Sequence, residues 1–376
     1  MIPRAYLQSL VEEIQNSRKI IILFGPRQVG KTTLAKETLK NLNLKSLHIN
    51  ADLERYANIL GSRDLEKMLS LVDGFELLFI DEAQRIPDIG INLKILHDHL
   101  PQLKILVTGS SAFDLANKTK EALTGRTLTY TLYPIAVKEL REWMNPIDIQ
   151  AQLESYLVYG MYPEIISLKN NQRKTRYLRE LVSSYLYRDI LELSSIKHAD
   201  KLTDLLKLIA FQIGSEVSLN ELGKQLGMAK ETVESYLDLL EKSFVIFRMR
   251  GFSRNLRKEV NKMSKYYFYD LGVRNTVIEN FNSLDLRNDR GQLWENFLMA
   301  ERRKKLAYVF EDANRYFWRT YTQQEIDYIE ESNGLLSGYE FKFSTAKVSA
   351  PRSWLETYPN ATFEVINQEN FLNFIT

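Results

Sequence analysis

Short apolar runs alternate with helical patterns through the first third of the chain. Residues 19–24 (KIIILF) form a compact apolar run that stops at Gly25, which is typical of a buried parallel strand. Similar strand signals, separated by helical stretches, recur at residues 46–50, 76–80, 103–108 and 127–133. Strands that alternate with helices need crossover connections, so the sequence predicts an α/β domain with a parallel sheet.

The pattern changes twice further along the chain. Residues 135–247 are almost entirely helical in pattern, whereas strand-like segments return at 266–269 and 315–343. These changes in the helix and strand pattern predict three domains, at residues 1–145, 146–260 and 261–376.

Composition narrows the classes of protein. The chain of 376 residues is 44% hydrophobic and 26% charged, which describes a globular protein. Its formal net charge of +2 neither demands nor excludes nucleic acid, so any basic surface must be local. The absence of cysteine excludes disulfides, thiolate zinc sites and cysteine nucleophiles. Neither a signal peptide nor an apolar run of bilayer length is found, so we expect a cytoplasmic protein without a membrane partner.

The turn after the first strand carries a phosphate-binding motif. Residues 25–32 (GPRQVGKT) fit G-x-x-x-x-G-K-[ST], in which backbone N–H groups face a phosphate at the start of a helix. Lys31 is expected to reach the β- and γ-phosphate oxygens, and the Thr32 hydroxyl to ligate Mg²⁺. The motif predicts ATP and Mg²⁺ as cofactors. The predicted nucleotide contacts are Gly25, Pro26, Arg27, Gln28, Val29, Gly30, Lys31, Thr32 and Thr33.

Polar residues follow two later strands of the same sheet. Asp81 follows the apolar run LLFI, at the strand end where ligands bind in open α/β sheets, and is predicted to hold the Mg²⁺ water shell. Glu82 comes next and is placed to act as the general base that polarises the attacking water. Ser110, or Thr108, is the candidate for contact with the γ-phosphate or that water, with a plain Gly-Ser turn as the alternative.

Arg126, in the sequence LTGR, is the candidate for stabilising charge on the transferred phosphate. A solvated arginine is the alternative.

The order of these motifs resembles a known family. The P-loop, LLFIDEAQ, LVTGSSA, LTGR and LYPIAVKEL are similar to the AAA-type ATPases of bacteria and archaea that carry an uncharacterised C-terminal domain. The similarity continues through YGMYPEI, SYLYRDI and KYYFYDLG and covers essentially the whole chain. It implies ATP binding in the first third, a homo-oligomer, and a helical region followed by a nuclease-like fold. Arg188, within SYLYRDI, would sense nucleotide.

Residues 216–236 predict a helix-turn-helix. Two short amphipathic helices flank a turn at Gly227, with Leu222 and Val233 among the residues expected in their core. The next segment, 244–265, has the single acid Glu259 and is where a wing would meet DNA phosphates. Its basic residues are Arg248, Arg250, Arg254, Arg257, Lys258, Lys262 and Lys265. We expect DNA as a partner, although mixed charge on the second helix leaves a protein-binding module open.

The last region carries acids and a lysine on neighbouring strands. Asp327 lies on one predicted strand, and Glu340 and Lys342, two residues apart on the next, share a face. Glu295, on the helix upstream, can add a third carboxylate. Such a group can bind one or two Mg²⁺ ions and activate a water against a phosphodiester. A binding fold with these charges merely solvated is the alternative.

The arrangement Glu…Asp…Glu-x-Lys resembles the PD-(D/E)xK restriction-endonuclease-like fold, although the proline of that signature is absent. The resemblance implies metal binding by Asp327 and Glu340, a supporting role for Glu295, and water activation by Lys342.

The whole sequence thus predicts an α/β protein of three parts: an AAA-type P-loop ATPase domain, a helical region with a winged helix-turn-helix, and a restriction-endonuclease-like domain. The predicted function is Mg²⁺-dependent ATP hydrolysis by a protein that acts on DNA. Two alternatives stay open. One is a nucleotide-switched signalling or scaffold ATPase that binds a protein partner, and the other is a DNA-binding regulator that cuts nothing.

Overall fold

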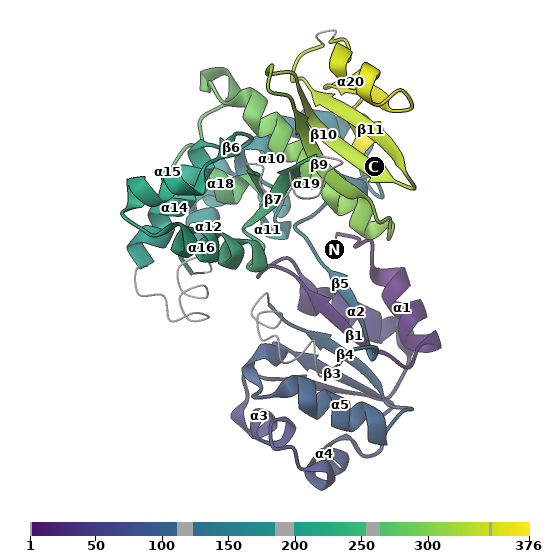
Figure 1. Ribbon diagram of the computed structural model, residues 1–376. Coiled ribbons are helices and arrows are strands. Elements are labelled where there is room, and N and C mark those ends of the chain that lie inside the picture. The colour runs from purple at the N-terminus through teal and green to yellow at the C-terminus, as the bar shows by residue number, and fades with distance from the viewer. Residues whose placement is uncertain (1, 111–122, 185–198, 253–263, 346–347) are drawn as a thin grey trace. The chain divides into compact units, whose positions relative to one another are not determined.

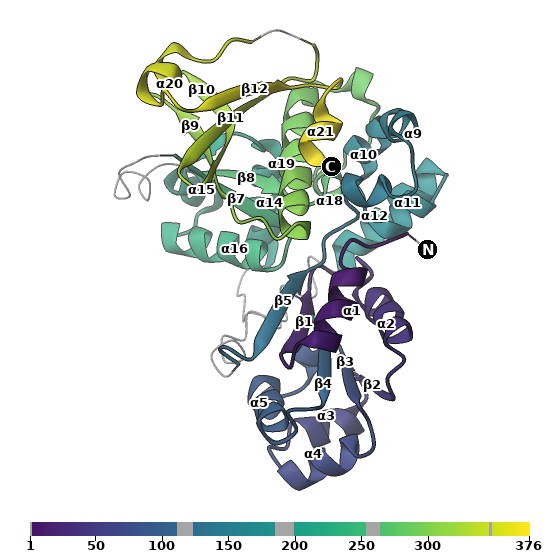
Figure 2. The same cartoon turned by 90° about the vertical axis from the view of Figure 1, so that its right-hand side faces the viewer.

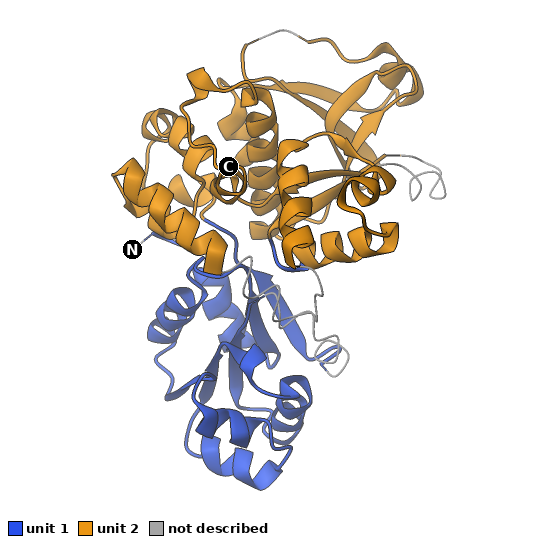
Figure 3. Ribbon diagram, turned by 90° about the vertical axis from the view of Figure 1, so that its left-hand side faces the viewer, with its two compact units in different colours: residues 1–134, 242–244 blue, residues 135–241, 245–376 orange. Residues whose placement is uncertain are grey.

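The computed structural model describes residues 2–110, 123–184, 199–252, 264–345 and 348–376 (Figure 1). The chain divides into two compact units (Figure 3). The first comprises residues 1–134 with 242–244, and the second comprises residues 135–241 with 245–376. Among the described residues, no helix has both the length and the apolar character needed to cross a membrane.

A five-stranded parallel sheet forms the centre of the first unit. Its strand order is β2-β3-β4-β1-β5, so β4 lies between the P-loop strand β1 and the strand β3 that ends at Asp81. The prediction of a parallel N-terminal α/β sheet is confirmed. The strands are β1 (Ile20–Phe24), β2 (Ser46–Asn50), β3 (Leu77–Asp81), β4 (Lys104–Thr108) and β5 (Thr127–Thr131).

Helices cover both faces of this sheet (Figures 1 and 2). Alternate residues of β1, such as Ile20 and Ile22, pack with Leu93 and Leu96 of α5 in one apolar core. Helix α1 contacts β1 and β4, and α2 contacts β4. The helices are α1 (Leu7–Asn16), α2 (Lys31–Leu42), α3 (Glu54–Leu60), α4 (Leu65–Val72), the 3₁₀ turn η1 (Ala83–Arg85) and α5 (Ile89–His99).

The second unit is built on a seven-stranded mixed sheet of order β12-β11-β10-β9-β7-β8-β6. Strands β9, β10 and β11 are antiparallel neighbours, whereas β12 runs parallel to β11 and β7 runs parallel to β9. The strands are β6 (Glu216–Val217), β7 (Ile246–Gly251), β8 (Ser264–Phe268), β9 (Asn314–Arg319), β10 (Glu325–Ser332), β11 (Leu335–Phe341) and β12 (Thr362–Ile366).

In the sequence, some helices of the second unit precede the first strand of its sheet, and others lie between the strands or after the last one. They are α8 (Val137–Leu140), α9 (Pro146–Ala151), α10 (Leu153–Tyr159), α11 (Pro163–Ser167), α12 (Asn171–Val182), α14 (Ala199–Phe211), α15 (Leu219–Leu226), α16 (Lys230–Lys242), α18 (Leu271–Val277), the 3₁₀ turn η3 (Leu284–Leu286), α19 (Arg290–Tyr308), α20 (Arg352–Thr357) and α21 (Phe371–Ile375). The long helix α19 contacts β8, β11 and α21 (Figure 2). On α20, Trp354 packs with Trp318 and Ile326 in a second apolar cluster.

One sheet joins residues that the sequence pattern assigns to different domains. The boundary predicted between residues 260 and 261 falls between β7 and β8, which pair as antiparallel neighbours. Strands from the predicted middle domain thus extend the sheet formed by the last third of the chain.

Two motifs noted in the sequence, YGMYPEI and KYYFYDLG, meet in the second unit. A Cβ on Gly160 would lie 2.0 Å from the Asp270 carboxylate, and one on Gly272 would lie 2.1 Å from the Tyr159 carbonyl oxygen. Asp270 accepts a hydrogen bond from the Met161 backbone N–H at 2.7 Å. These glycines therefore permit close packing of α10 on α18, which explains the motifs structurally.

Candidate functional site

The turn between β1 and α2 has a backbone that only glycine tolerates at its first position. Gly25 has φ +144°, and a Cβ there would lie 2.0 Å from the Leu132 carbonyl oxygen. Gly30 has φ +95° and immediately precedes α2. Pro26, Arg27, Gln28 and Val29 form the turn, and Thr33 lies in the first turn of the helix. The loop therefore has the curled shape that directs successive N–H groups at a phosphate.

Lys31 is folded back into this loop. Its ammonium donates to the carbonyl oxygens of Gly25 at 2.9 Å and Pro26 at 2.8 Å, and the residue is 5% exposed. Burial lowers the pKa of Lys31 to about 8, against an opposing effect of Glu82 and Asp81. The amine is held beside the position that a phosphate group would take.

Three elements meet at the Asp81 carboxylate. The hydroxyl of Thr32, at the start of α2, donates to Asp81 Oδ1 at 3.0 Å. The hydroxyl of Thr108, at the end of β4, donates to the same oxygen. A hydroxyl and a carboxylate in contact are the groups that hold Mg²⁺ and its waters in P-loop sites, so the donor set fits the ion.

Glu82 has a left-handed backbone, with φ +56°, directly after β3. Its carboxylate accepts a hydrogen bond from the Gln84 side-chain amide at 2.5 Å, and the Gln84 carbonyl oxygen accepts one from the Ser110 backbone N–H at 3.3 Å. Gln84 thus links the two candidate catalytic residues. Thr108, rather than Ser110, is the residue that touches Asp81.

Arg126 lies at the opposite edge of the sheet from the P-loop. The register pairs Ile20 with Thr127, so Arg126 adjoins the amino-terminal end of β1, roughly 16 Å along the strand from Gly25. Its guanidinium donates to both carboxylate oxygens of Asp98, at 2.8 and 3.1 Å. This position does not fit the predicted contact with a phosphate bound to the same chain.

Arg4 lies at the P-loop edge of the sheet, and the sequence patterns do not reveal it. Its guanidinium donates to the Val29 carbonyl oxygen at 2.5 Å and to the Tyr133 carbonyl oxygen at 2.7 Å. It ties the P-loop to the segment that follows β5. No motif marks it, because a lone arginine near the start of a chain has no local pattern.

A second group of charged residues lies on the sheet of the second unit. Asp327 on β10 accepts a hydrogen bond from the Phe341 backbone N–H at 2.8 Å, and Glu340 accepts one from the Lys342 ammonium at 2.7 Å. Glu295 comes from α19 and accepts a hydrogen bond from the Tyr267 hydroxyl at 2.6 Å. The residues predicted from sequence are therefore neighbours on β10, β11 and α19.

Burial and the charges of nearby carboxylates make the Asp327 and Glu295 carboxyl groups hard to ionise. Burial, followed by the charges of Glu295 and Glu340, raises the pKa of Asp327 well above its ordinary value. Burial also raises the pKa of Glu295, although Lys265 opposes the shift. An added cation would relieve this repulsion.

The arrangement is not a ready-made metal cage. Within the described ranges of the chain, no group of three or more Asp, Glu or His side chains is spaced to hold a metal ion. One oxygen of Glu340, Oε2, is buried and makes no hydrogen bond. That orphaned carboxylate oxygen fits a cation held by a pair of carboxylates rather than by three.

The predicted basic strip is only partly described. Arg254, Arg257, Lys258 and Lys262 lie outside the described residues, as does Arg188. Arg250 is exposed on β7. Lys265, by contrast, is 3% exposed and bonds to Glu325, so it cannot belong to a surface that meets DNA phosphates.

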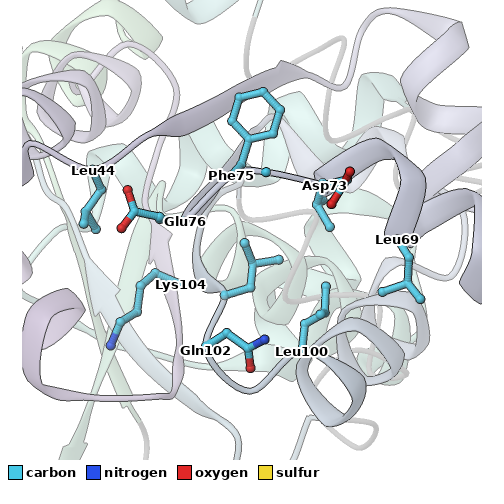
Figure 4. Close-up of a pocket in the computed structure, with 11 residues that line it drawn as sticks. Leu44, Leu69, Asp73, Phe75, Glu76, Leu100, Gln102 and Lys104 are labelled. Atoms are coloured by element: carbon cyan, nitrogen blue, oxygen red, sulfur yellow. The ribbon is translucent and has the colours of Figure 1, made fainter.

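A separate pocket of about 600 Å³ lies at the amino-terminal ends of β3 and β4, away from the P-loop (Figure 4). Leu44, Leu69, Phe75 and Leu100 line it, with Lys104 at its edge. The Lys104 ammonium donates to the Ser17 carbonyl oxygen at 2.8 Å, so this charge is already satisfied.

Three segments of the chain match known families. Residues 17–141 match the family described as AAA domain. Residues 150–284 and 290–370 match two domains of unknown function, DUF8612 and DUF4143. An uncharacterized protein of Mycobacterium tuberculosis is 28% identical over 88% of this chain and 72% of its own length. One of Methanocaldococcus jannaschii is 24% identical over 83% of this chain and 72% of its own length.

A solved structure shares the fold. The Walker-type ATPase of Pyrococcus abyssi superposes with a TM-score of 0.50 and 16% identity, covering 74% of this chain and 96% of that one. Together with the AAA-domain match, this similarity makes residues 17–141 an AAA-type P-loop ATPase fold.

Proposed function

We propose that this protein binds ATP with Mg²⁺, hydrolyses it, and uses the turnover to act on DNA. The observation that carries the proposal is the convergence of Lys31, Thr32 and Asp81 at the carboxyl edge of one parallel sheet. Opposite charges and a metal-binding hydroxyl lie next to a helix N-terminus, which is the set of groups that phosphoryl transfer requires.

Each residue has a separate task in this proposal. Lys31 leaves the Gly25 and Pro26 carbonyl oxygens and pairs with the β- and γ-phosphate oxygens. Thr32 and Asp81 hold Mg²⁺, which when bound neutralises charge that develops on the phosphates. Glu82 orients and deprotonates the attacking water once Gln84 releases its carboxylate, and Thr108 fixes the Asp81 oxygen that it already contacts.

The order of elements in residues 199–268 supports a DNA-binding role. The order α14, β6, α15, α16, β7 and β8, with β6 and β7 paired to β8 on either side, agrees with the winged helix that we propose here. At the turn, a Cβ on Gly223 would lie 2.7 Å from the Met228 carbonyl oxygen, so α15 packs closely on the turn before α16. This arrangement favours DNA over a scaffold function, because the segment between β7 and β8 is also the most basic of the region.

Glu295, Asp327 and Glu340 form the acidic group that we call the rear site. These rear acidic residues favour a second activity, the metal-dependent cleavage of a phosphodiester. The order α19, β9, β10, β11, α20 and β12, with β12 parallel to β11, agrees with a restriction-endonuclease-like core. The buried, unbonded Glu340 Oε2 supports a cation between Asp327 and Glu340. In that role Lys342 would orient the water that attacks the phosphorus.

One set of assays tests both activities. ATP turnover by the full chain is measured with and without duplex DNA, and DNA integrity is followed with Mg²⁺ or Mn²⁺. We expect DNA to accelerate turnover by wild-type protein and Glu82→Gln to bind ATP without hydrolysing it. Equal turnover by wild type and Lys31→Ala would refute the ATPase proposal. Turnover that is indifferent to DNA would favour the signalling or scaffold alternative.

A further inference from the structure

Strand β8 brings two side chains to the rear acidic residues from outside the β9–β12 part of the sheet. Lys265 and Tyr267 are two residues apart on β8 and therefore share a face. The Lys265 ammonium lies 2.5 Å from Glu325 Oε1 and 3.7 Å from Glu295 Oε1. The Tyr267 hydroxyl donates to the same Glu295 oxygen. Neither residue stands out in the sequence as part of an acidic site.

The burial of Lys265 requires these partners. A buried ammonium is costly unless opposite charges and hydrogen bonds compensate for its lost hydration. Lys265 meets this requirement with acids from a helix and a strand that are distant in sequence, and its ammonium also lies 5.1 Å from the centre of the Phe317 ring. Its backbone is fixed between β7 and β6.

We propose that Lys265 is a positioning residue: a fixed internal cation that holds Glu295 and Glu325 and sets the charge of the site for one divalent ion at Asp327 and Glu340. This inference rests on the metal-binding role proposed above. Lys265 lies between the Glu295 and Glu325 carboxylates, and Glu325 also lies 3.9 Å from the Arg319 guanidinium. Lys342 pairs with Glu340. A change in the charge of Lys265 or Glu325 therefore changes the net charge around the proposed metal position.

The role differs from that of an ordinary structural ion pair in the sign of its effects. Glu325 partly neutralises Lys265, so Glu325→Gln leaves the ammonium with Glu295 as its carboxylate partner and should weaken the binding of a divalent ion. Lys265→Met removes a repelling charge and should strengthen it. The double variant Lys265→Met/Glu325→Gln removes one charge of each sign and therefore restores the original net charge around the metal position.

The test is a calorimetric titration of the nucleotide-free full chain with Mn²⁺. Asp327→Ala serves as the blank, because it removes the proposed rear site and leaves ions bound elsewhere. After the heat measured with this blank is subtracted, we expect the wild-type chain to bind one Mn²⁺ ion. Glu325→Gln should bind it about tenfold more weakly or worse, and the double variant should return to near wild-type affinity. Circular dichroism and thermal melting confirm that each variant is folded.

The outcomes separate the two levels of the proposal. A wild-type titration that matches Asp327→Ala would refute the rear metal site itself. Binding by wild type with unchanged affinity in Glu325→Gln would overturn the role of Lys265, and so would equal weakening in Glu325→Gln and the double variant. If Lys265→Met alone does not fold, Glu325→Gln and the double variant still decide. Their opposite expected directions are not produced by a general loss of stability.

Discussion

The first unit carries its P-loop, Asp81 and Thr108 at one edge of the sheet, which we call the phosphate edge. This edge and the rear site of the second unit are built in different ways. At the phosphate edge, β1, β3 and β4 run parallel. The residues that follow these strands therefore lie at the same edge of the sheet as a consequence of strand direction alone. The rear site instead gathers side chains from β8, α19, β10 and β11 across a mixed sheet. One site follows from strand direction, whereas the other depends on long-range pairing.

The two sites also balance charge differently. At the phosphate edge a buried lysine lies near Asp81 and Glu82, and its direct contacts are backbone carbonyl oxygens that a phosphate can replace. In the rear site, carboxylates crowd together and pair with two lysines, Lys265 on β8 and Lys342 directly after β11. Substitutions at the first site should therefore act on nucleotide chemistry, and those at the second on cation affinity.

Single substitutions, one at each site, should give the largest difference in activity between the two sites. Lys31→Ala removes the positive charge that faces the γ-phosphate and should lower the ATP turnover number by at least about a hundredfold. Asp327→Ala should leave turnover within about twofold, since it changes only the rear site, while abolishing any DNA cleavage. Steady-state ATPase and nuclease assays on both variants measure this. A comparable loss of ATP turnover in Asp327→Ala would break the comparison by making the sites interdependent.

Glycine substitutions test whether the P-loop backbone is as constrained as its geometry indicates. Gly25→Ala places a methyl group 2.0 Å from the Leu132 carbonyl oxygen at φ +144°, so the loop must move. We expect a stability loss of roughly 1–3 kcal/mol and little remaining ATP affinity. Gly291→Ala, in the first turn of α19, is the matched control, since a methyl group there meets nothing within 4 Å. Melting curves and nucleotide titrations that agree for the two variants would contradict the prediction.

The sequence is sufficient for the phosphate edge because its information is local. The first strand, the glycines of the loop and Asp81 lie in short segments whose pattern already states their conformation. The position of Arg126 does not fit contact with a phosphate bound to the same chain, because the order of motifs along the sequence does not show which end of a strand a residue adjoins. Gln84, two residues after Asp-Glu, could have been noticed, since its amide is within reach of Glu82.

The rear site could be predicted only in part. Spacing alone placed Glu340 and Lys342 on one face and paired them with Asp327. Lys265 and Tyr267 could not be found, because their role depends on β8 joining the sheet through β7 and β9, a pairing that no local pattern encodes. The same residue, Lys265, looks like part of a basic surface in the sequence and is buried among acids in the fold.

The affinity of the phosphate edge for ATP should depend on pH, which is a smaller expected effect than those above. Without nucleotide, burial holds the pKa of Lys31 at about 8, below its ordinary value. ATP favours the charged amine, so below pH 8 the affinity should be insensitive to this group. Above pH 8 the free protein must take up a proton on binding, and affinity should fall by up to about tenfold per pH unit. Calorimetric titrations in buffers of different ionisation enthalpy would detect the uptake. Lys31→Arg, which stays charged, should lack this dependence.

The smallest expected effect concerns the basic segment before β8. If Arg254, Arg257 and Lys258 contact phosphates, replacing all three with alanine should weaken DNA binding uniformly across sequences. The slope of log affinity against log salt should fall by roughly one unit for each lost contact. Fluorescence anisotropy with a labelled duplex at several salt concentrations measures both. Arg248→Ala is the control, because the Arg248 guanidinium donates to the Ser264 hydroxyl at 2.8 Å within the sheet. Unchanged affinity of the triple variant at low salt would assign these charges to a solvated face. It would also shift the function of the second unit toward a protein partner.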